Sequence, residues 1–159
     1  MYIIKRISSK ITREIWRMLH PQIWGCKLQI NGIPEIIGNK KLKLGKNISI
    51  NDDVVIQAIG NVVIGNNVTI SRGCTILTTG LDTNNYKENW KKTLRDHIVK
   101  DVVIEDGVWL GACVTVTPGA YIAEGTIVAS GAVVVGKLEE TNALYGGVPA
   151  KLLKKYNIK

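Results

Sequence analysis

Aliphatic side chains recur along this chain at every sixth position. One series contains Leu44, Ile50 and Ile56, the next contains Ile64, Ile70 and Ile76, and the longest contains Ile104, Leu110, Val116, Ile122, Val128 and Val134. A second series, with smaller residues in the C-terminal half, lies two positions ahead of the first. Because residues two apart on a strand point to the same side, each six-residue unit is predicted to be a short strand followed by a turn.

Three such units close a triangular coil, and neighbouring coils pair through backbone hydrogen bonds at a spacing of about 4.8 Å. Glycine, asparagine and aspartate stand at the expected corners, for example at 45–47, 65–67 and 105–107, and these residue types tolerate the positive φ of tight turns. A β-sandwich would space its strands by about 8 to 12 residues, and helices would show a period of 3.6. The sequence therefore predicts an all-β fold, a parallel β-helix.

Two interruptions of the period divide the chain. Two extra residues between Ile56 and Ile64 predict an enlarged corner at 58–61, and the repeat stops between Ile76 and Ile104. Long insertions in a compact fold are usually functional or disordered. We expect an N-terminal cap segment at 1–41, a β-helix at 42–138 with a loop insertion at 79–100, and a C-terminal tail or helix at 139–159.

The N-terminal segment has the pattern of a short helix. Its apolar residues are Ile11, Ile15, Trp16, Met18 and Leu19, and Pro21 follows them. The helix is predicted to begin near Thr12 and to end at the proline. It caps the first open coil or, as the alternative, lies as a basic helix on a membrane surface.

Composition indicates the charge of the binding partners and the cellular location, but it does not identify the activity. The net charge of +8 favours anionic partners, but charge does not choose among nucleic acid, lipid and a phosphate-bearing cofactor. Some of the positive charge forms a run of Lys40, Lys41, Lys43 and Lys46. An odd number of cysteines and the lack of a membrane-spanning run or a signal peptide predict a soluble, cytoplasmic protein.

The repeat pattern of an aliphatic residue, glycine and four further residues resembles the hexapeptide-repeat acyltransferases. The likeness covers 42–154, is most specific from 108 to 151, and is closest to galactoside, maltose and colanic-acid type sugar O-acetyltransferases. It implies a left-handed β-helix, a homotrimer, acetyl-CoA as acyl donor, and a sugar or glycan acceptor in capsule, O-antigen or other surface polysaccharide synthesis. It implies no metal and no nucleic-acid partner.

Acetyl transfer to a hydroxyl needs a base with a pKa near 7, and histidine is the natural candidate. The chain has only His20 and His97. We interpret His20, beside Pro21, as a surface or packing residue, and His97 in the insertion as the catalytic base. The resemblance implies a histidine shortly after the strand before the insertion, where Leu81 stands. His97 replaces that histidine, or it is a solvated loop residue in a protein that has changed or lost its catalysis.

The resemblance also assigns the donor site. It implies that Gly111, Ala112, Ala129, Ser130 and Gly131 follow the pantetheine arm, that Lys137 and Lys151 lie near the phosphates, and that Trp109 flanks the pocket or contacts a neighbouring subunit. Lys137 is displaced by one position from the usual lysine. A backbone N–H near Gly111 or Ala129 is expected to stabilise the oxyanion.

We expect Asn51, Asp53 and Asp82 to contact the acceptor. As an alternative, Asp82 orients His97. Other activities remain open: N-acetylation of an amino-sugar nucleotide, serine acetylation, or a catalytically degenerate structural β-helix. Two histidines cannot supply the three ligands of a carbonic-anhydrase-like metal site, and the isolated cysteines add no plausible ligand set.

Overall fold

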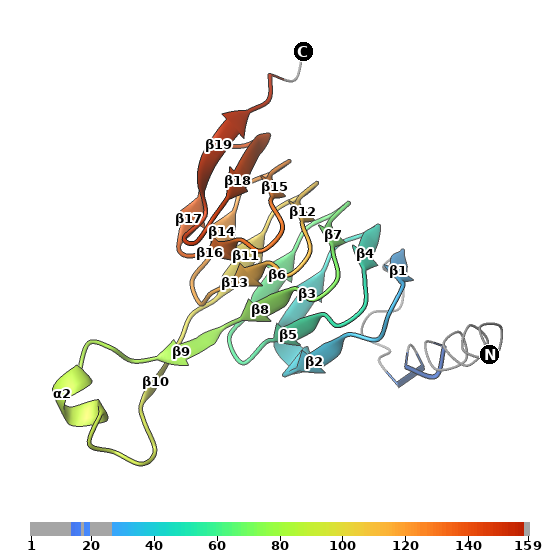
Figure 1. Ribbon diagram of the computed structural model, residues 1–159. Helices are drawn as coiled ribbons and strands as arrows, with labels where there is room; N and C mark the ends of the chain where they lie inside the picture. Colours follow the sequence, from blue (N-terminus) through green and yellow to red (C-terminus); the bar gives the residue numbers. More distant parts are fainter. Residues whose placement is uncertain (1–13, 17, 20–26, 158–159) are drawn as a thin grey trace, which may run out of the picture.

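The protein is a three-sided prism of parallel strands with one projecting arm (Figure 1). The computed structural model describes residues 14–16, 18–19 and 27–157. Sheet A contains β1 (Leu28–Ile30), β4 (Ile48–Ile50), β7 (Thr69–Ile70), β12 (Trp109–Leu110), β15 (Ile127–Val128), β18 (Ala143–Gly146) and β19 (Lys151–Lys155). Sheet B contains β2 (Glu35–Ile37), β5 (Val55–Gln57), β8 (Thr75–Leu77), β13 (Thr115–Val116) and β16 (Val133–Val134). Sheet C contains β3 (Leu42–Leu44), β6 (Val62–Ile64), β11 (Val102–Ile104), β14 (Tyr121–Ile122) and β17 (Lys137–Leu138).

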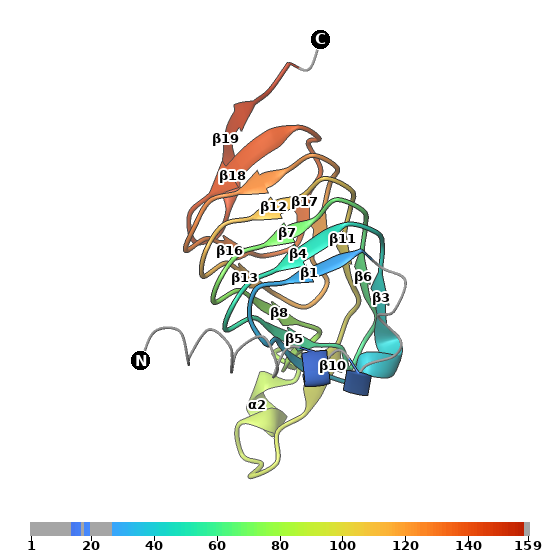
Figure 2. The same cartoon turned by 90° about the vertical axis from the view of Figure 1, so that its right-hand side faces the viewer.

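The chain visits sheets A, B and C in turn, so each circuit forms one coil, and the strands of sheet A stack from β1 to β18 (Figure 2). The predicted inward positions form the core. Ile50, Ile70, Leu110 and Val128 follow one another in register through sheet A, and all four are fully buried. The six-residue spacing is confirmed, because it returns each aliphatic side chain to the interior on every face.

The β-helix begins earlier than the sequence pattern indicated. Strands β1 and β2 pair in parallel with β4 and β5, so the start is corrected from residue 42 to Leu28. Residues 14–16 and 18–19 are helical, as predicted, and Trp16 packs against the core. The rest of the predicted helix and its end at Pro21 lie outside the described residues.

The C-terminal segment forms strands in place of a helix. Strand β18 completes sheet A and β19 pairs with it in antiparallel fashion, so the predicted tail or helix is corrected to a hairpin. Pairing supplies partners to the backbone groups at the last edge of the sheet, and this gain exceeds the helical propensity of the Lys-Leu-Leu-Lys-Lys sequence.

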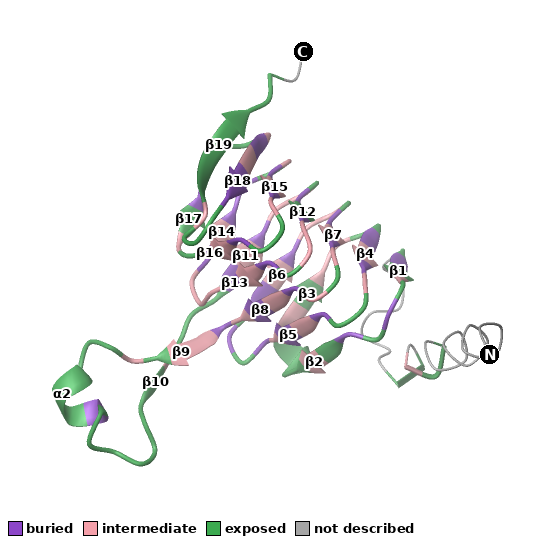
Figure 3. Ribbon diagram, in the orientation of Figure 1, coloured by how far each residue is buried: buried purple, intermediate pink, exposed green. Residues whose placement is uncertain are grey.

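The insertion forms an arm that leaves the prism between sheets B and C. Strands β9 (Thr79–Leu81) and β10 (His97–Val99) pair in antiparallel fashion, and the short helix α2 (Tyr86–Asn89) lies at the tip. The buried Asn89 side chain donates to the carbonyls of Asp82 and Asp96 at 2.9 and 3.1 Å and accepts from the Asp96 N–H at 2.6 Å. These three bonds order the tip, although most of the arm is exposed (Figure 3).

Candidate functional site

The donor residues expected from the sequence lie together on the A/B edge, where each coil turns from sheet A to sheet B. Gly111 and Ala112 follow β12, and Ala129, Ser130 and Gly131 follow β15 one coil further on. Backbone hydrogen bonds of 2.8 Å from Gly111 N–H to the Val128 carbonyl and from Gly131 N–H to the Ala112 carbonyl hold the two turns in register. The edge therefore presents a continuous strip of small residues.

The close stacking of the coils is enough to explain why position 111 is glycine. A Cβ at Gly111 would lie 2.7 Å from the Ser130 nitrogen and 2.8 Å from the Val128 oxygen, so a larger residue would separate the coils. Gly131 has open space around it and a φ of 73°. Its glycine serves the turn and leaves the surface beside Ser130 unobstructed.

The expected oxyanion donors are already used. The Gly111 N–H donates to Val128 and the Ala129 N–H donates to the Tyr145 carbonyl, both at 2.8 Å. The expected donor is a backbone N–H near Gly111 or Ala129, and each of these two would have to break a bond between coils to serve the oxyanion. The Ala112 N–H is different, since its acceptor at 3.1 Å is the Ser130 hydroxyl, which can rotate away.

The expected acceptor residues Asn51 and Asp53 both follow β4 on the same edge, two coils nearer the N-terminus than Gly111. Asn51 accepts a 2.8 Å hydrogen bond from the Asn31 amide. Asp53, with a φ of 57°, forms a 2.8 Å ion pair with Arg72. The hydrogen bond and the charge of Asp53 raise the pKa of Arg72. Both groups are largely exposed, so the pair adds little stability and can open for a ligand.

Ser71 and Arg72 were not predicted, although the repeat contained their signal. They follow β7 as Asn51 follows β4 and Gly111 follows β12. Trp109 lies on the outer face of sheet A, half exposed, and its indole N–H donates to the Ser71 hydroxyl at 3.1 Å. Trp109 therefore points away from the interior, and the hydrogen bond directs its ring toward the A/B edge.

Two free cysteines also adjoin this edge. Cys74 is buried, its thiol donates to the Gly111 carbonyl at 3.0 Å, and burial raises its pKa. Cys113 is exposed and occupies a turn position with a φ of 58°.

On the arm, His97 lies directly opposite Leu81. Backbone bonds join Asp82 N–H to Asp96 and Lys100 N–H to Thr78, so the Leu81–His97 pair is one of the alternating pairs without mutual hydrogen bonds. In such pairs the Cα atoms are about 4.5 Å apart and the side chains are closest. The imidazole therefore lies one strand spacing from the position expected of the catalytic histidine.

Asp82 does not orient this histidine. Its carboxylate accepts the Asn84 N–H at 2.9 Å. Alternation along β9 places it on the face of the arm opposite to Leu81 and His97. His20 lies outside the described residues.

A single chain does not bring the candidate residues together. His97 projects from the edge between sheets B and C, whereas Gly111 to Gly131 lie on the A/B edge, with sheet B between them. Lys137 lies in β17 on sheet C, and Lys151 begins β19 at the C-terminal end of sheet A. The candidate base therefore lies at one edge of the prism, and the candidate donor residues lie at another.

The described residues show two further absences. In the described ranges, no three or more His, Cys, Asp or Glu side chains are grouped so as to hold a metal. In the same part of the chain, no helix has the length and apolar character needed to cross a membrane.

Residues 101–136 match the family described as Bacterial transferase hexapeptide (six repeats). The hexapeptide repeat of this family is therefore present in the chain. It is 34% identical over 130 residues to the Escherichia coli K12 protein named "Putative lipopolysaccharide biosynthesis O-acetyl transferase WbbJ", covering 77% of this chain and 65% of that one. It is 28% identical to a galactoside O-acetyltransferase of Lactococcus lactis, covering 76% and 56%. The chain thus spans 65% and 56% of the length of these two relatives.

Solved structures agree with this assignment. A hexapeptide-repeat acetyltransferase from Vibrio cholerae superposes with a TM-score of 0.76 at 25% identity, covering 92% of this chain and 80% of that one. A maltose O-acetyltransferase from Clostridium difficile shares the fold, with a TM-score of 0.77 at 20% identity over 94% and 87% of the two chains.

Proposed function

We propose that this protein is an acetyltransferase that moves the acetyl group of acetyl-CoA to a sugar hydroxyl. Its family and the O-acetyltransferase names of its relatives support acetyl transfer. A structure of the Vibrio cholerae protein complexed with acetyl coenzyme A supports the donor, with a TM-score of 0.72. We assign the chain to surface polysaccharide synthesis in the cytoplasm. The exposed Ile15, Met18 and Leu19 beside a basic N-terminal sequence support contact with a membrane surface.

The single observation that carries the proposal is the position of His97. It stands opposite Leu81 on a two-stranded arm fixed to a rigid prism, and it is exposed for contact with a ligand. A solvated loop histidine needs no such register. An imidazole with an accessible ring nitrogen can remove the proton of an acceptor hydroxyl near neutral pH.

In the proposed reaction, His97 takes the proton as the acceptor oxygen attacks the acetyl carbonyl. The oxyanion is stabilised by the Ala112 N–H once the Ser130 hydroxyl rotates away, as preorganised backbone donors do in acyl transfer. The C–S bond then breaks, and the protonated imidazole returns its proton to the leaving thiolate. No covalent intermediate with the protein is needed.

The donor lies along the A/B edge, with Lys151 available to its phosphates. Because His97 and this edge lie on different sides of sheet B, we assign each active site to two neighbouring chains of a homotrimer, with the arm of one facing the A/B edge of the next. Asn51 and Asp53 lie on the same A/B edge, N-terminal to the strip from Gly111 to Gly131, and we assign them to the acceptor. Lys137 on sheet C is separated from the A/B edge of its own chain.

The test is release of free CoA thiol by the purified protein, measured with acetyl-CoA and a panel of free, nucleotide-linked and lipid-linked sugars. Thiol release that depends on one acceptor, with an acetyl ester in the product, is the expected result. An acetamide formed only on amino sugars would instead make the protein an N-acetyltransferase. No transfer to any acceptor, with acetyl-CoA bound or unbound, would reject the proposed activity.

A further inference from the structure

A pocket of about 370 Å³ lies on the B/C edge, the edge from which the arm leaves the prism. It is lined by Gly38, Asn39, Lys40, Lys41, Ala58 and Ile59. These residues come from the enlarged corners of the first two coils, each of which carries two residues more than a regular corner. The third coil carries the arm at this edge and the fourth keeps the regular six-residue spacing from Val116 to Ile122, so the pocket is a local addition to the repeat.

The two enlarged corners stack closely beside the pocket. Gly38 has a φ of 78°, and a Cβ at this position would collide with the Ala58 carbonyl. Any other residue would force the first corner away from the second. Beneath the pocket, the buried Thr78 hydroxyl accepts the N–H groups of Ile59 and Gly60 at 3.0 Å and donates to the Gln57 carbonyl at 2.8 Å. Ala58 and Ile59 are therefore held next to the residue that precedes the arm.

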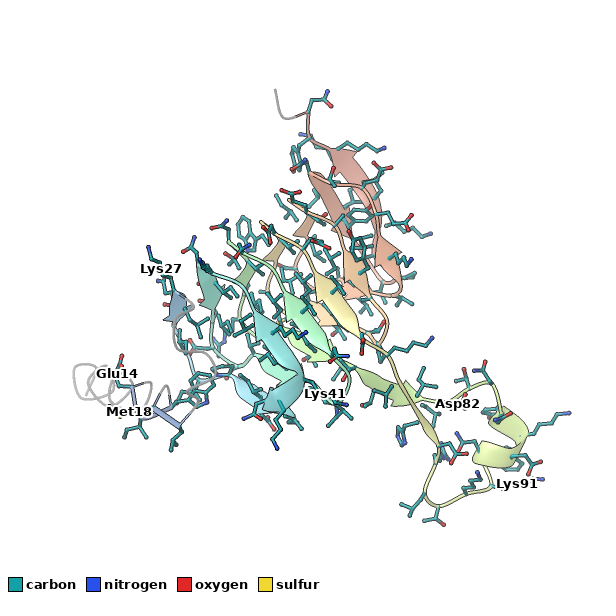
Figure 4. All side chains as sticks on the ribbon, turned by 180° about the vertical axis from the view of Figure 1, so that it is seen from behind. Glu14, Met18, Lys27, Lys41, Asp82 and Lys91 are labelled. Atoms are coloured by element: carbon teal, nitrogen blue, oxygen red, sulfur yellow. The ribbon has the colours of Figure 1, made fainter. Side chains whose placement is uncertain are left out.

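Two lysines supply its charge. Lys41 Nζ donates to the Ile59 carbonyl at 2.6 Å, which fixes the ammonium group at the rim and leaves two of its N–H bonds free. Lys40 is exposed and makes no hydrogen bond or ion pair with the described residues. Figure 4 shows Lys41 on the prism edge near the root of the arm.

The carboxylate of Asp101 does not cancel this charge fully. Asp101 lies close enough to Lys41 for that lysine to lower its pKa, but the larger causes are hydrogen bonds from the Asn61 side chain and backbone. These bonds, at 3.0 and 2.8 Å, occupy the carboxylate oxygens. The free donors at the pocket remain those of Lys40 and Lys41.

The arm directs His97 toward this pocket. Residues 79, 81, 97 and 99 share one face of the arm, because side chains alternate along a strand. Thr79 donates to the Gln57 side chain and Val99 lies against Gly60, so this face looks toward the second coil, whose corner forms part of the pocket. The opposite face, with Gly80 and Ile98, lies against Pro118 of the fourth coil. His97 is two residues beyond Val99, roughly 7 Å along the strand.

We infer that this pocket binds the phosphate-bearing end of the acceptor, so that the substrate is a sugar carried as a diphosphate ester and not a free sugar. The inference rests on the proposed acetyl transfer. Ammonium groups suit phosphate oxygens, and Ala58 with Ile59 gives an apolar floor for the group attached to the phosphate. A nucleoside diphosphate sugar and a prenyl diphosphate glycan share this chemistry.

The experiment compares kcat/KM for one acceptor sugar presented in three forms: free, as a nucleoside diphosphate ester, and as a short-chain prenyl diphosphate ester. One diphosphate form is expected to exceed the free sugar by at least about tenfold, since a hydrogen bond to a charged group contributes on the order of a factor of 10 or more. Which of the two forms is preferred identifies the carrier. Equal kcat/KM for the free sugar and both esters would overturn the inference while leaving the acetyltransferase activity established.

Two double variants distinguish binding at the pocket from a general effect of positive charge. Lys40→Ala combined with Lys41→Ala should raise KM for the diphosphate ester about 10- to 100-fold, with KM for acetyl-CoA unchanged. Lys43→Ala combined with Lys46→Ala removes the same charge from the same run but away from the pocket, and should leave both KM values unchanged. Equal effects of the two double variants would contradict the assignment.

A binding measurement tests the pocket even if no acceptor is acetylated. Inorganic diphosphate is titrated calorimetrically into the unmodified protein and both double variants. Loss of binding only in the Lys40/Lys41 variant supports the site. Indistinguishable binding to all three proteins would overturn it, whatever the outcome for acetyl transfer.

Discussion

Leu81 and His97 are far apart in the sequence but face each other across the arm. The sequence shows that position 81 holds leucine and that a histidine occurs later in the insertion. It does not show whether that histidine returns to the same place, because the answer depends on the register of an antiparallel pair. A shift of one residue would have sent the imidazole to the opposite face. The observed register favours replacement over a solvated loop histidine.

This pairing can be tested by moving the imidazole. His97→Ala should lower turnover by about 10² to 10⁴, the usual contribution of general base catalysis, with coenzyme A binding preserved. Adding Leu81→His to that variant should restore part of the activity, because the new imidazole lies on the same face one strand away. Turnover is measured by thiol release.

The matched control is Leu94→Ala, which alters a fully exposed arm residue and should leave turnover unchanged. Unchanged turnover in His97→Ala would remove this histidine from the mechanism. Failure of Leu81→His to restore any activity would show that position 81 no longer reaches the substrate.

At the scale of the coils, the sequence predicted the interior well and the ends poorly. The regular coils repeat aliphatics without interruption, so their strands could be located from spacing alone. In the first coil, Pro34 takes an inward position and two extra residues near Gly38 change the phase. The sequence predicts the same enlargement between Ile56 and Ile64, and the structure confirms it there. The enlarged corner near Gly38 was not predicted, because the first coil lacks the regular aliphatic spacing on which that prediction depended.

The C-terminal hairpin was missed for a different reason. Residues 151–155 have good helical propensity, and propensity is a weak guide when an unpaired sheet edge is nearby. Only the position of β18 shows that such an edge exists. Edge pairing is a property of the assembled coil, and it cannot be read from the local sequence.

The corners between coils give a pH-dependent prediction. Asp106 accepts the Asn66 side chain at 2.9 Å and its backbone N–H at 2.7 Å, and these bonds, the side-chain bond first, lower the Asp106 pKa. A lowered carboxyl pKa contributes stability above the unfolded value of about 3.8, and this stability is lost as the pH falls through the lower folded value. Asp106→Ala should therefore lower the melting temperature at pH 7, and the difference from the unmodified protein should shrink below about pH 4.

Thermal unfolding followed by circular dichroism between pH 3 and pH 7 measures this difference. Glu124→Ala is the control, since Glu124 is an exposed corner residue whose side chain has no hydrogen bond within the described chain. A melting-temperature difference for Asp106→Ala that stays constant over this range would show that the carboxylate charge does not stabilise the corner.

At the scale of the whole molecule, the proposed base and the proposed donor residues lie on different edges of one prism. The sequence could assign residues to coils, but the edge that each corner occupies follows from counting strands through all three sheets. Sheet B separates the arm from the strip formed by Gly111 to Gly131, and the prism is too well packed to bring them together within one chain. The proposed reaction therefore requires the edge of a second chain.

Mixed oligomers test this directly. One variant, His97→Ala, has a defective arm, and a second, Ser130→Trp, has a blocked A/B edge; Ser130 is exposed, so the larger side chain has room. Each should be nearly inactive alone. Co-expressed with two different tags and purified through both, they should regain about a third of the unmodified activity, because every mixed cyclic trimer has one site of its three in which an intact arm faces an intact edge. Mass measurement in solution verifies the trimer, and mixing the purified variants without reassembly provides the control. Activity equal to the mean of the two inactive parents, in a verified mixed trimer, would place the whole site within one chain.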